Sequence, residues 1–250
     1  MNYIVIDLEF NGRRHYEIYP MEIIEIGAVK LNERLAIIDT FQSYIRPQFH
    51  INRFALQFCG ISKDTLTGSR PFTEVIEEFI AFCGTDSTLL SWGGNDFFSL
   101  FVDCKVNRVD SSWLTRMIDL TSFFRGGLQQ ELANYGLQPI GQHHSALDDA
   151  LNAAQLLRVK PDIVHTDRRF VPNAFKLCTG GIKKYIAQSI DRADVQGAPL
   201  SWDRFLQDEQ TVKYIAAMNL DDAEIDMIRQ LFAKFMQMKY GRKYKKLLYA

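Results

Sequence analysis

The 250-residue chain has no long apolar run, only four cysteines and almost no net charge. No hydrophobic stretch approaches the roughly 20 residues of a membrane-spanning helix, so we expect no membrane protein. The cysteines form no Cys-x-x-Cys pair and are expected to be reduced core thiols of a cytoplasmic protein. The first ten residues carry two acids and no basic leader, which speaks against a secretory signal.

The small net charge hides an uneven distribution along the chain. Residues 1–160 carry 14 basic and 19 acidic side chains, whereas residues 161–250 carry 15 basic and 11 acidic ones. The first part would therefore repel a polyanion, and the second part would attract it.

Apolar periodicity predicts an α/β domain over residues 1–160. Three segments with strand-like patterns follow one another closely, which predicts an antiparallel meander at 2–10, 22–31 and 36–46. The spacing then becomes helical. The expected elements are helices at 72–84, 97–106, 128–137 and 145–157, a strand at 88–94, and a strand followed by a helix start within 112–125. Such an order is typical of a mixed sheet flanked by helices.

Residues 161–250 are expected to form a helical C-terminal extension. Helical patterns occupy 175–190, which Gly180-Gly181 interrupts, and then 200–218 and 221–238, with start signals at Ser201 and Asp221. The chain ends in KYGRKYKK, where Lys243 and its basic neighbours could follow the phosphates of a nucleic acid. A solvated tail and a protein-binding extension are the alternatives.

Two acids stand at alternate positions of the first expected strand, VIDLEF. Asp7 and Glu9 should share one face, while residues 4, 6, 8 and 10 point into the core. Neighbouring carboxylates repel each other, and hard divalent cations prefer such oxygen ligands. The pair therefore indicates either a cation site or two solvated acids on an edge strand.

The segment QHHSALDDAL (142–151) offers two equivalent His/Asp pairs. Ser145 is a good helix N-cap, and Asp148 completes what resembles a capping box. A helical projection sends Asp148 to the solvent face together with Asn152 and Gln155, and it places Asp149 at the margin of the apolar face. An acid at a buried margin needs a partner. His144 lies in the loop just before the helix.

The order of these motifs resembles the DEDDh 3′–5′ exonucleases, in particular the Eri-type exoribonucleases and the bacterial KapD-type proteins. The resemblance rests on D7-L-E9, on Asp96 in SWGGNDFF and on H144-S-A-L-D-D149. It covers residues 1–160 and implies an RNase H-like fold. It also implies two Mg²⁺ or Mn²⁺ ions held by Asp7, Glu9, Asp96 and Asp149, while His144 takes a proton from the attacking water. His143 is left as a surface or substrate-contact residue.

The substrate contacts are less well defined by the sequence. The resemblance suggests that Leu56 or Phe58 lies near the 3′-terminal nucleotide, and Trp92 or a neighbouring aromatic could stack on a base. Simple core packing is the alternative for each of them, as helix capping is for Asp96. Phe10 stands where many family members have a small residue beside the terminal ribose.

We therefore expect a metal-dependent 3′–5′ exonuclease that releases nucleoside 5′-monophosphates from single-stranded nucleic acid, RNA rather than DNA. One alternative is a binding or regulatory protein that keeps the fold and acts through its helical extension. Another is a DNA exonuclease of the proofreading type.

Overall fold

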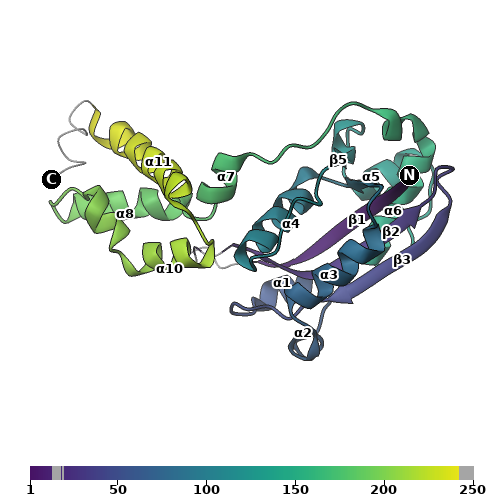
Figure 1. Ribbon diagram of the computed structural model, residues 1–250, viewed down its shortest axis with the longest axis horizontal. Coiled ribbons are helices and arrows are strands. Elements are labelled where there is room, and N and C mark those ends of the chain that lie inside the picture. The colour runs from purple at the N-terminus through teal and green to yellow at the C-terminus, as the bar shows by residue number, and fades with distance from the viewer. Residues whose placement is uncertain (13–17, 19, 242–250) are drawn as a thin grey trace. The chain divides into compact units, whose positions relative to one another are not determined.

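The computed structural model describes residues 1–12, 18 and 20–241 (Figure 1). Their contacts define two compact units, and the first one comprises residues 1–12 and 21–172. This unit continues past residue 160 because a short 3₁₀ helix, Pro161–His165, buries Ile163 and Val164 in its core. The backbone N–H of Phe170 then donates to the carbonyl of Met117 at 2.8 Å.

A five-stranded mixed sheet forms the centre of the first unit, in the order β3-β2-β1-β4-β5. The predicted meander is confirmed, since β2 pairs antiparallel with both β1 and β3. β4 then joins β1 in parallel, and β5 joins β4 in parallel. The strands are β1 (Asn2–Asn11), β2 (Glu22–Leu31), β3 (Ile37–Tyr44), β4 (Ser87–Ser91) and β5 (Met117–Asp119).

Helices cover both faces of this sheet (Figure 1). Alternate residues of β1 enter two different cores: Ile4 and Ile6 pack with α3 and α4, whereas Tyr3 and Val5 pack with α5 and α6. The helices of this unit are α1 (Arg53–Cys59), α2 (Lys63–Gly68), α3 (Phe72–Cys83), α4 (Gly94–Val106), α5 (Leu128–Asn134) and α6 (Ala146–Val159), with a 3₁₀ turn at Leu120–Ser122. The sequence did not predict α1 and α2, which are each shorter than two turns and begin at the side-chain caps Asn52 and Ser62.

The second unit is helical, as predicted. Its described helices are α7 (Ala174–Thr179), α8 (Lys183–Val195), α9 (Trp202–Leu206), α10 (Glu209–Ala217) and α11 (Asp222–Tyr240). Asp221 starts α11 with a full capping box, in which its carboxylate accepts from the Glu224 N–H and the Glu224 side chain accepts from the Asp221 N–H. Phe205, Tyr214 and Phe232 are fully buried between these helices. Across the described residues, no helix is long and apolar enough to cross a membrane.

Candidate active site

Strand β1 presents Asp7 and Glu9 on the sheet face that carries α6. Strand alternation explains this placement, because their neighbours Ile6 and Leu8 belong to the core on the opposite face. In the antiparallel register, Asp7 lies opposite Gly27 of β2, and Glu9 lies opposite Glu25. The shared face that the sequence predicted for the two acids is therefore confirmed.

A third carboxylate reaches this face from the first turn of α6. Carboxylate oxygens of Asp7, Glu9 and Asp149 all lie within 4.8 Å of one another. Gly27 permits this approach, because a Cβ at that position would lie only 2.1 Å from backbone atoms of Ala146 and Leu147. The glycine in EIIEIGAV thus lets the start of α6 rest directly on β2.

Asp96 lies in the first turn of α4, which follows β4. Its carboxylate accepts a hydrogen bond from the Ser91 hydroxyl and does not cap the helix, because Gly93 occupies the N-cap position. Asp96 is not part of the group that Asp7, Glu9 and Asp149 form, but its charge raises the pKa of both Asp7 and Glu9. Burial raises the pKa of Asp96 itself to about 7.

The electrostatics of this cluster are unfavourable in the absence of a cation. Burial, followed by the charges of Asp96 and Asp149, holds the pKa of Asp7 well above its usual range. Burial and the charge of Glu25 raise the pKa of Glu9 to about 8. Asp149 is only 5% exposed, and its Oδ1 has no hydrogen-bond partner among the described residues. Buried acids with an unpartnered oxygen are a donor set that fits a hard divalent cation.

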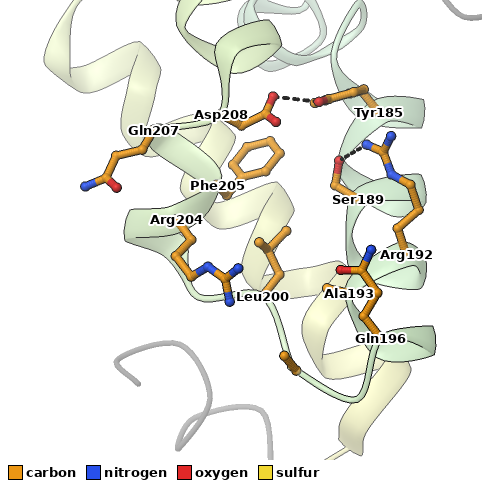
Figure 2. Close-up of a pocket in the computed structure, with 11 residues that line it drawn as sticks. Tyr185, Ser189, Arg192, Ala193, Gln196, Leu200, Arg204, Phe205, Gln207 and Asp208 are labelled. Atoms are coloured by element: carbon orange, nitrogen blue, oxygen red, sulfur yellow. Dashed lines mark hydrogen bonds between the residues drawn. The ribbon is translucent and has the colours of Figure 1, made fainter.

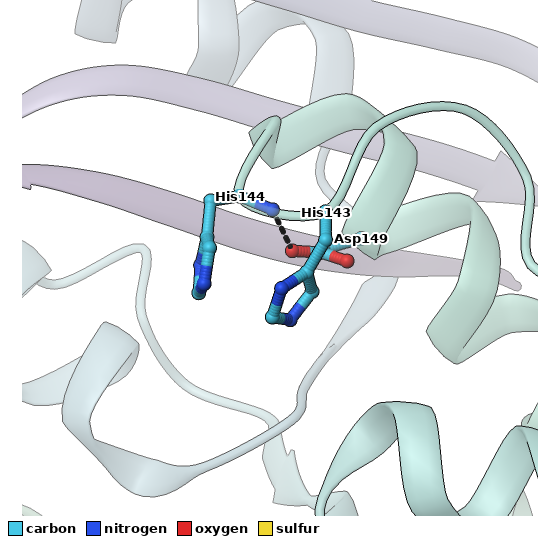
Figure 3. Close-up of side chains that lie close together, drawn as sticks. All are labelled: His143, His144 and Asp149. Atoms are coloured by element: carbon cyan, nitrogen blue, oxygen red, sulfur yellow. Dashed lines mark hydrogen bonds between the residues drawn. The ribbon is translucent and has the colours of Figure 1, made fainter. Parts of the chain in front are cut away.

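His144 stands beside these acids in an unusual backbone conformation. Its φ of 66° is uncommon for a residue with a side chain, and its backbone N–H donates to Asp149 Oδ2 at 2.9 Å. The centroid of its imidazole lies 3.7 Å from that of His143 (Figure 3) and 3.8 Å from that of Phe58. Burial and the neighbouring His143 lower the pKa of His144, which favours its neutral form.

The helix start of α6 differs from the predicted capping box. The Ser145 side chain makes no capping hydrogen bond. Asp148 instead accepts from the Gln142 N–H at 2.8 Å, so it ties down the preceding loop. Asn152 was predicted to face water but is buried, because its side-chain amide exchanges hydrogen bonds with the backbone N–H and carbonyl of Ile140. Asp149 is buried, as expected for the margin of the apolar face, whereas Asp148 is half-buried and not on the solvent face that was predicted for it.

Glu25 is a buried acid that the sequence analysis did not single out. Its side chain is 1% exposed and accepts hydrogen bonds from the Gln42 amide at 2.7 Å and from the Ala146 N–H at 3.3 Å. It therefore joins β2 and β3 to the start of α6. The sequence predicted the antiparallel pairing of the first two strands but not its register, which is what places Glu25 opposite Glu9.

The residues expected to contact substrate lie in different surroundings. Leu56 is buried and packs against Ile24, and Phe10 packs against the core on the face away from the acids. Trp92 is half-buried, and its ring centroid lies 4.9 Å from that of Phe124. For these three the core-packing alternative matches their surroundings. The fourth, Phe58, is 64% exposed beside His144, and Lys243 lies outside the described residues.

Comparison with known proteins places the chain in a family. Residues 4–157 match the Exonuclease family RNase_T, and the chain belongs to that family. It is 28% identical over 182 residues to the probable 3′–5′ exonuclease KapD of Bacillus subtilis, covering 67% of this chain and 86% of KapD. It is also 28% identical over 162 residues to the PolC-type DNA polymerase III of Caldanaerobacter subterraneus. That match covers 62% of this chain but only 11% of the polymerase.

Solved structures show the same fold. The nuclease domain of 3′hExo, a DEDDh family member bound to rAMP, matches with a TM-score of 0.61 and 25% identity, over 69% of this chain and 97% of that domain. Escherichia coli exonuclease I in complex with single-stranded DNA matches with a TM-score of 0.55 and 14% identity, over 66% of this chain and 42% of that protein. The expected RNase H-like fold and the resemblance to DEDDh exonucleases are thereby confirmed.

Proposed function

We propose that this protein is a divalent-metal-dependent 3′–5′ exonuclease that acts on single-stranded RNA and releases nucleoside 5′-monophosphates. One observation carries the proposal: oxygens of Asp7, Glu9 and Asp149 converge within 4.8 Å, next to Asp96 and His144. A binding protein that merely kept the fold would gain nothing from buried, mutually repelling acids. Their retention therefore favours an enzyme over a regulatory protein.

The four acids are the ligands that we assign to the metal. Two Mg²⁺ or Mn²⁺ ions, held by Asp7, Glu9, Asp96 and Asp149, would stabilise the attacking and leaving oxygens of an in-line displacement. The unpartnered Oδ1 of Asp149 supports this assignment, because a buried carboxylate oxygen is costly to leave without a partner.

His144 is the residue that we assign to proton transfer. Its lowered pKa keeps the imidazole neutral near pH 7, so the ring can accept a proton from the attacking water. The bond from its backbone N–H to Asp149 Oδ2 fixes the loop that carries the ring relative to the acids. His143 is more exposed than His144 and receives no catalytic role, although its ring nitrogen lies within 4.8 Å of ligand atoms of His144 and Asp149.

Phe58 is the substrate contact that the surroundings favour. Its ring is exposed and lies 3.8 Å, between centroids, from that of His144. An exposed aromatic at the edge of a nuclease site can stack on the 3′-terminal base whatever its identity. The helix α1 that carries it is anchored by the buried Leu56 on its other side.

RNA is the substrate that we favour, with single-stranded DNA as the second candidate. The RNA proposal is supported by the likeness to 3′hExo bound to rAMP. The DNA alternative is supported by the match to PolC-type polymerases.

The test is the degradation of 3′- and 5′-labelled single-stranded RNA and DNA with Mg²⁺, with Mn²⁺ and with a chelator. We expect stepwise shortening from the 3′ end, faster on RNA, and abolished both by the chelator and by Asp7→Asn. Faster cleavage of DNA would support the proofreading alternative, and wild-type protein inert on every substrate would refute the enzymatic proposal.

Two further measurements test the residue assignments. Mn²⁺ should raise the melting temperature of the wild-type protein but not that of Asp149→Asn, because a ligand that binds the native state stabilises it. His144→Ala should lose roughly 100-fold or more in rate while it keeps the Mn²⁺-dependent stabilisation. An equal loss of rate in His143→Ala would contradict the choice between the two histidines.

A further inference from the structure

The helical second unit contains a polar pocket of about 420 Å³. Helix α8 forms one wall with Ser189 and Arg192, and helix α9 and the residues after it form the facing wall with Arg204 and Gln207 (Figure 2). Leu200 and the buried ring of Phe205 add apolar surface. The pocket lies wholly within this unit, and none of its lining residues belongs to the candidate active site.

Two guanidinium groups give the pocket a positive character. Among the described residues that line it, Asp208 is the one acid. Its Oδ1 is already engaged, because it accepts from the Tyr185 hydroxyl at 2.6 Å and from the Gln210 and Thr211 backbone N–H groups at 3.0 and 3.2 Å. It is the N-cap of α10, where the helix dipole partly offsets its charge. Both positive charges are therefore only partly balanced.

The two arginines are presented differently. Arg192 is held in place, since it donates to the Ser189 hydroxyl at 3.0 Å and its guanidinium carbon lies 5.3 Å from the centroid of the Tyr185 ring. These contacts leave N–H groups available, because a guanidinium carries five. The Arg204 guanidinium makes no hydrogen bond or ion pair with any residue that the structure describes. An arginine that lacks a partner among the described residues, on the wall of a polar pocket, is available to bind an anion.

We propose that this pocket binds the phosphate group of a nucleotide. A guanidinium fork matches the geometry of phosphate oxygens, and each of the two facing walls carries one such group. The side-chain amide of Gln196 and the apolar surface of Leu200 would suit an attached sugar and base. The volume is within the range of small-ligand sites. The choice of a nucleotide over other phosphates rests on the proposed nuclease function.

The ligand has two possible sources, a free nucleoside 5′-monophosphate and a phosphate within a nucleic-acid strand. The test uses the intact protein with EDTA, so that no hydrolysis occurs, and follows the arginine Nε–Hε signals by nuclear magnetic resonance. The probes are inorganic phosphate, adenosine, AMP and a short oligoadenylate RNA. Arg192→Gln and Arg204→Gln assign the two signals.

We expect AMP to shift both arginine signals and adenosine to leave them unchanged. Arg204→Gln should weaken AMP binding about tenfold, as for the loss of one charge-assisted hydrogen bond. Lys234→Gln is the matched control, because it removes one positive charge from the exposed side of α11, outside the pocket, and should leave the dissociation constant unchanged. Tighter binding of the RNA than of AMP identifies a strand as the source, and the reverse identifies the mononucleotide.

Two results would overturn the proposal: arginine signals that neither AMP nor the RNA shifts, or an equal loss of affinity in Arg204→Gln and Lys234→Gln. Failure of the proposed nuclease function is distinguishable from either result, because binding is read without metal and without turnover. Asp7→Asn, expected to be inactive, should bind AMP at the pocket with wild-type affinity.

Discussion

Replacing Gly27 by alanine should disable the candidate active site through a single methyl group. Gly27 lies in the middle of β2, opposite Asp7, and the backbone of α6 rests on it. A Cβ at this position would lie 2.1 Å from the carbonyl carbon of Ala146 and 2.1 Å from the nitrogen of Leu147. Both of these atoms are backbone, so no side-chain rotation can relieve the overlap.

The size of the effect follows from these distances. Ordinary van der Waals contact begins near 3.4 Å, so the strand and the start of α6 must separate by about 1.3 Å. Overpacking of this kind typically costs about 1–3 kcal/mol of stability. The larger consequence concerns Asp149, which lies one turn into α6, because a displacement of about 1 Å at a catalytic group can cost on the order of 100-fold in rate.

The assay compares Gly27→Ala with Gly68→Ala, a glycine in the same unit where an added Cβ meets no atom within 4 Å. Melting temperatures and the rate of RNA hydrolysis with Mg²⁺ are measured for both variants, well below either melting point. We expect Gly68→Ala to behave as wild type, and Gly27→Ala to be folded but slower by about two orders of magnitude. Near-wild-type hydrolysis by Gly27→Ala would refute the idea that the contact of α6 with β2 sets the position of Asp149.

Three further predictions concern Glu25, Phe58 and Asp103. Glu25→Ala should slow hydrolysis about tenfold, because the Ala146 N–H loses its acceptor. Glu25→Gln keeps an acceptor and should recover most of that loss. Equal rates in the two variants would contradict the idea that Glu25 holds the start of α6. Phe58→Ala should raise the KM for single-stranded RNA about tenfold, because stacking on the base is lost. Phe54 is an exposed phenylalanine one turn earlier on α1, and Phe54→Ala should leave the KM unchanged. Similar KM values in the two variants would exclude stacking by Phe58. Burial raises the pKa of Asp103 to about 8. The folded protein therefore binds the carboxyl proton of Asp103 more tightly than the unfolded chain does. As a result, the contribution of Asp103 lowers the free energy of unfolding as the pH rises from about 4 to about 8. Asp103→Asn keeps an acceptor for the Ile23 backbone N–H. The free energy of unfolding of this variant, relative to wild type, should increase with pH by up to about 5 kcal/mol. If denaturant titrations give a stability difference that does not depend on pH, the raised pKa of Asp103 is contradicted.

The sequence predicted the elements that build the sheet, because their patterns are regular and long. The meander of β1, β2 and β3 and the amphipathic α3 were found from periods of two and of 3.6 residues. The helices α1 and α2 escaped detection because each is shorter than two turns. Such a helix depends on caps and tertiary packing more than on periodicity.

The environment of α6 shows where projection from the sequence stops. The projection correctly turned Asp149 inward, since that depends only on helical geometry, but Asp148 is half-buried and does not face water as predicted. It placed Asn152 in water because it contained no information on the preceding loop, which folds over that side of the helix at Ile140. The contact of Glu25 with the Ala146 N–H was missed for the same reason, since it joins residues that are far apart in the chain.

Several features that oppose stability coincide in the candidate active site. His144 has a positive φ, Glu9 and Glu25 lie opposite each other within the sheet, and an oxygen of Asp149 is buried without a described partner. Each of them costs free energy, and the two apolar cores that sandwich the sheet offset that cost. A divalent cation would remove much of the repulsion, so its binding free energy should appear partly as stability of the fold. The unfavourable backbone conformation, the facing acids and the unpartnered oxygen thus occur together at the place where a cation would bind. Such local conflicts are expected at functional sites.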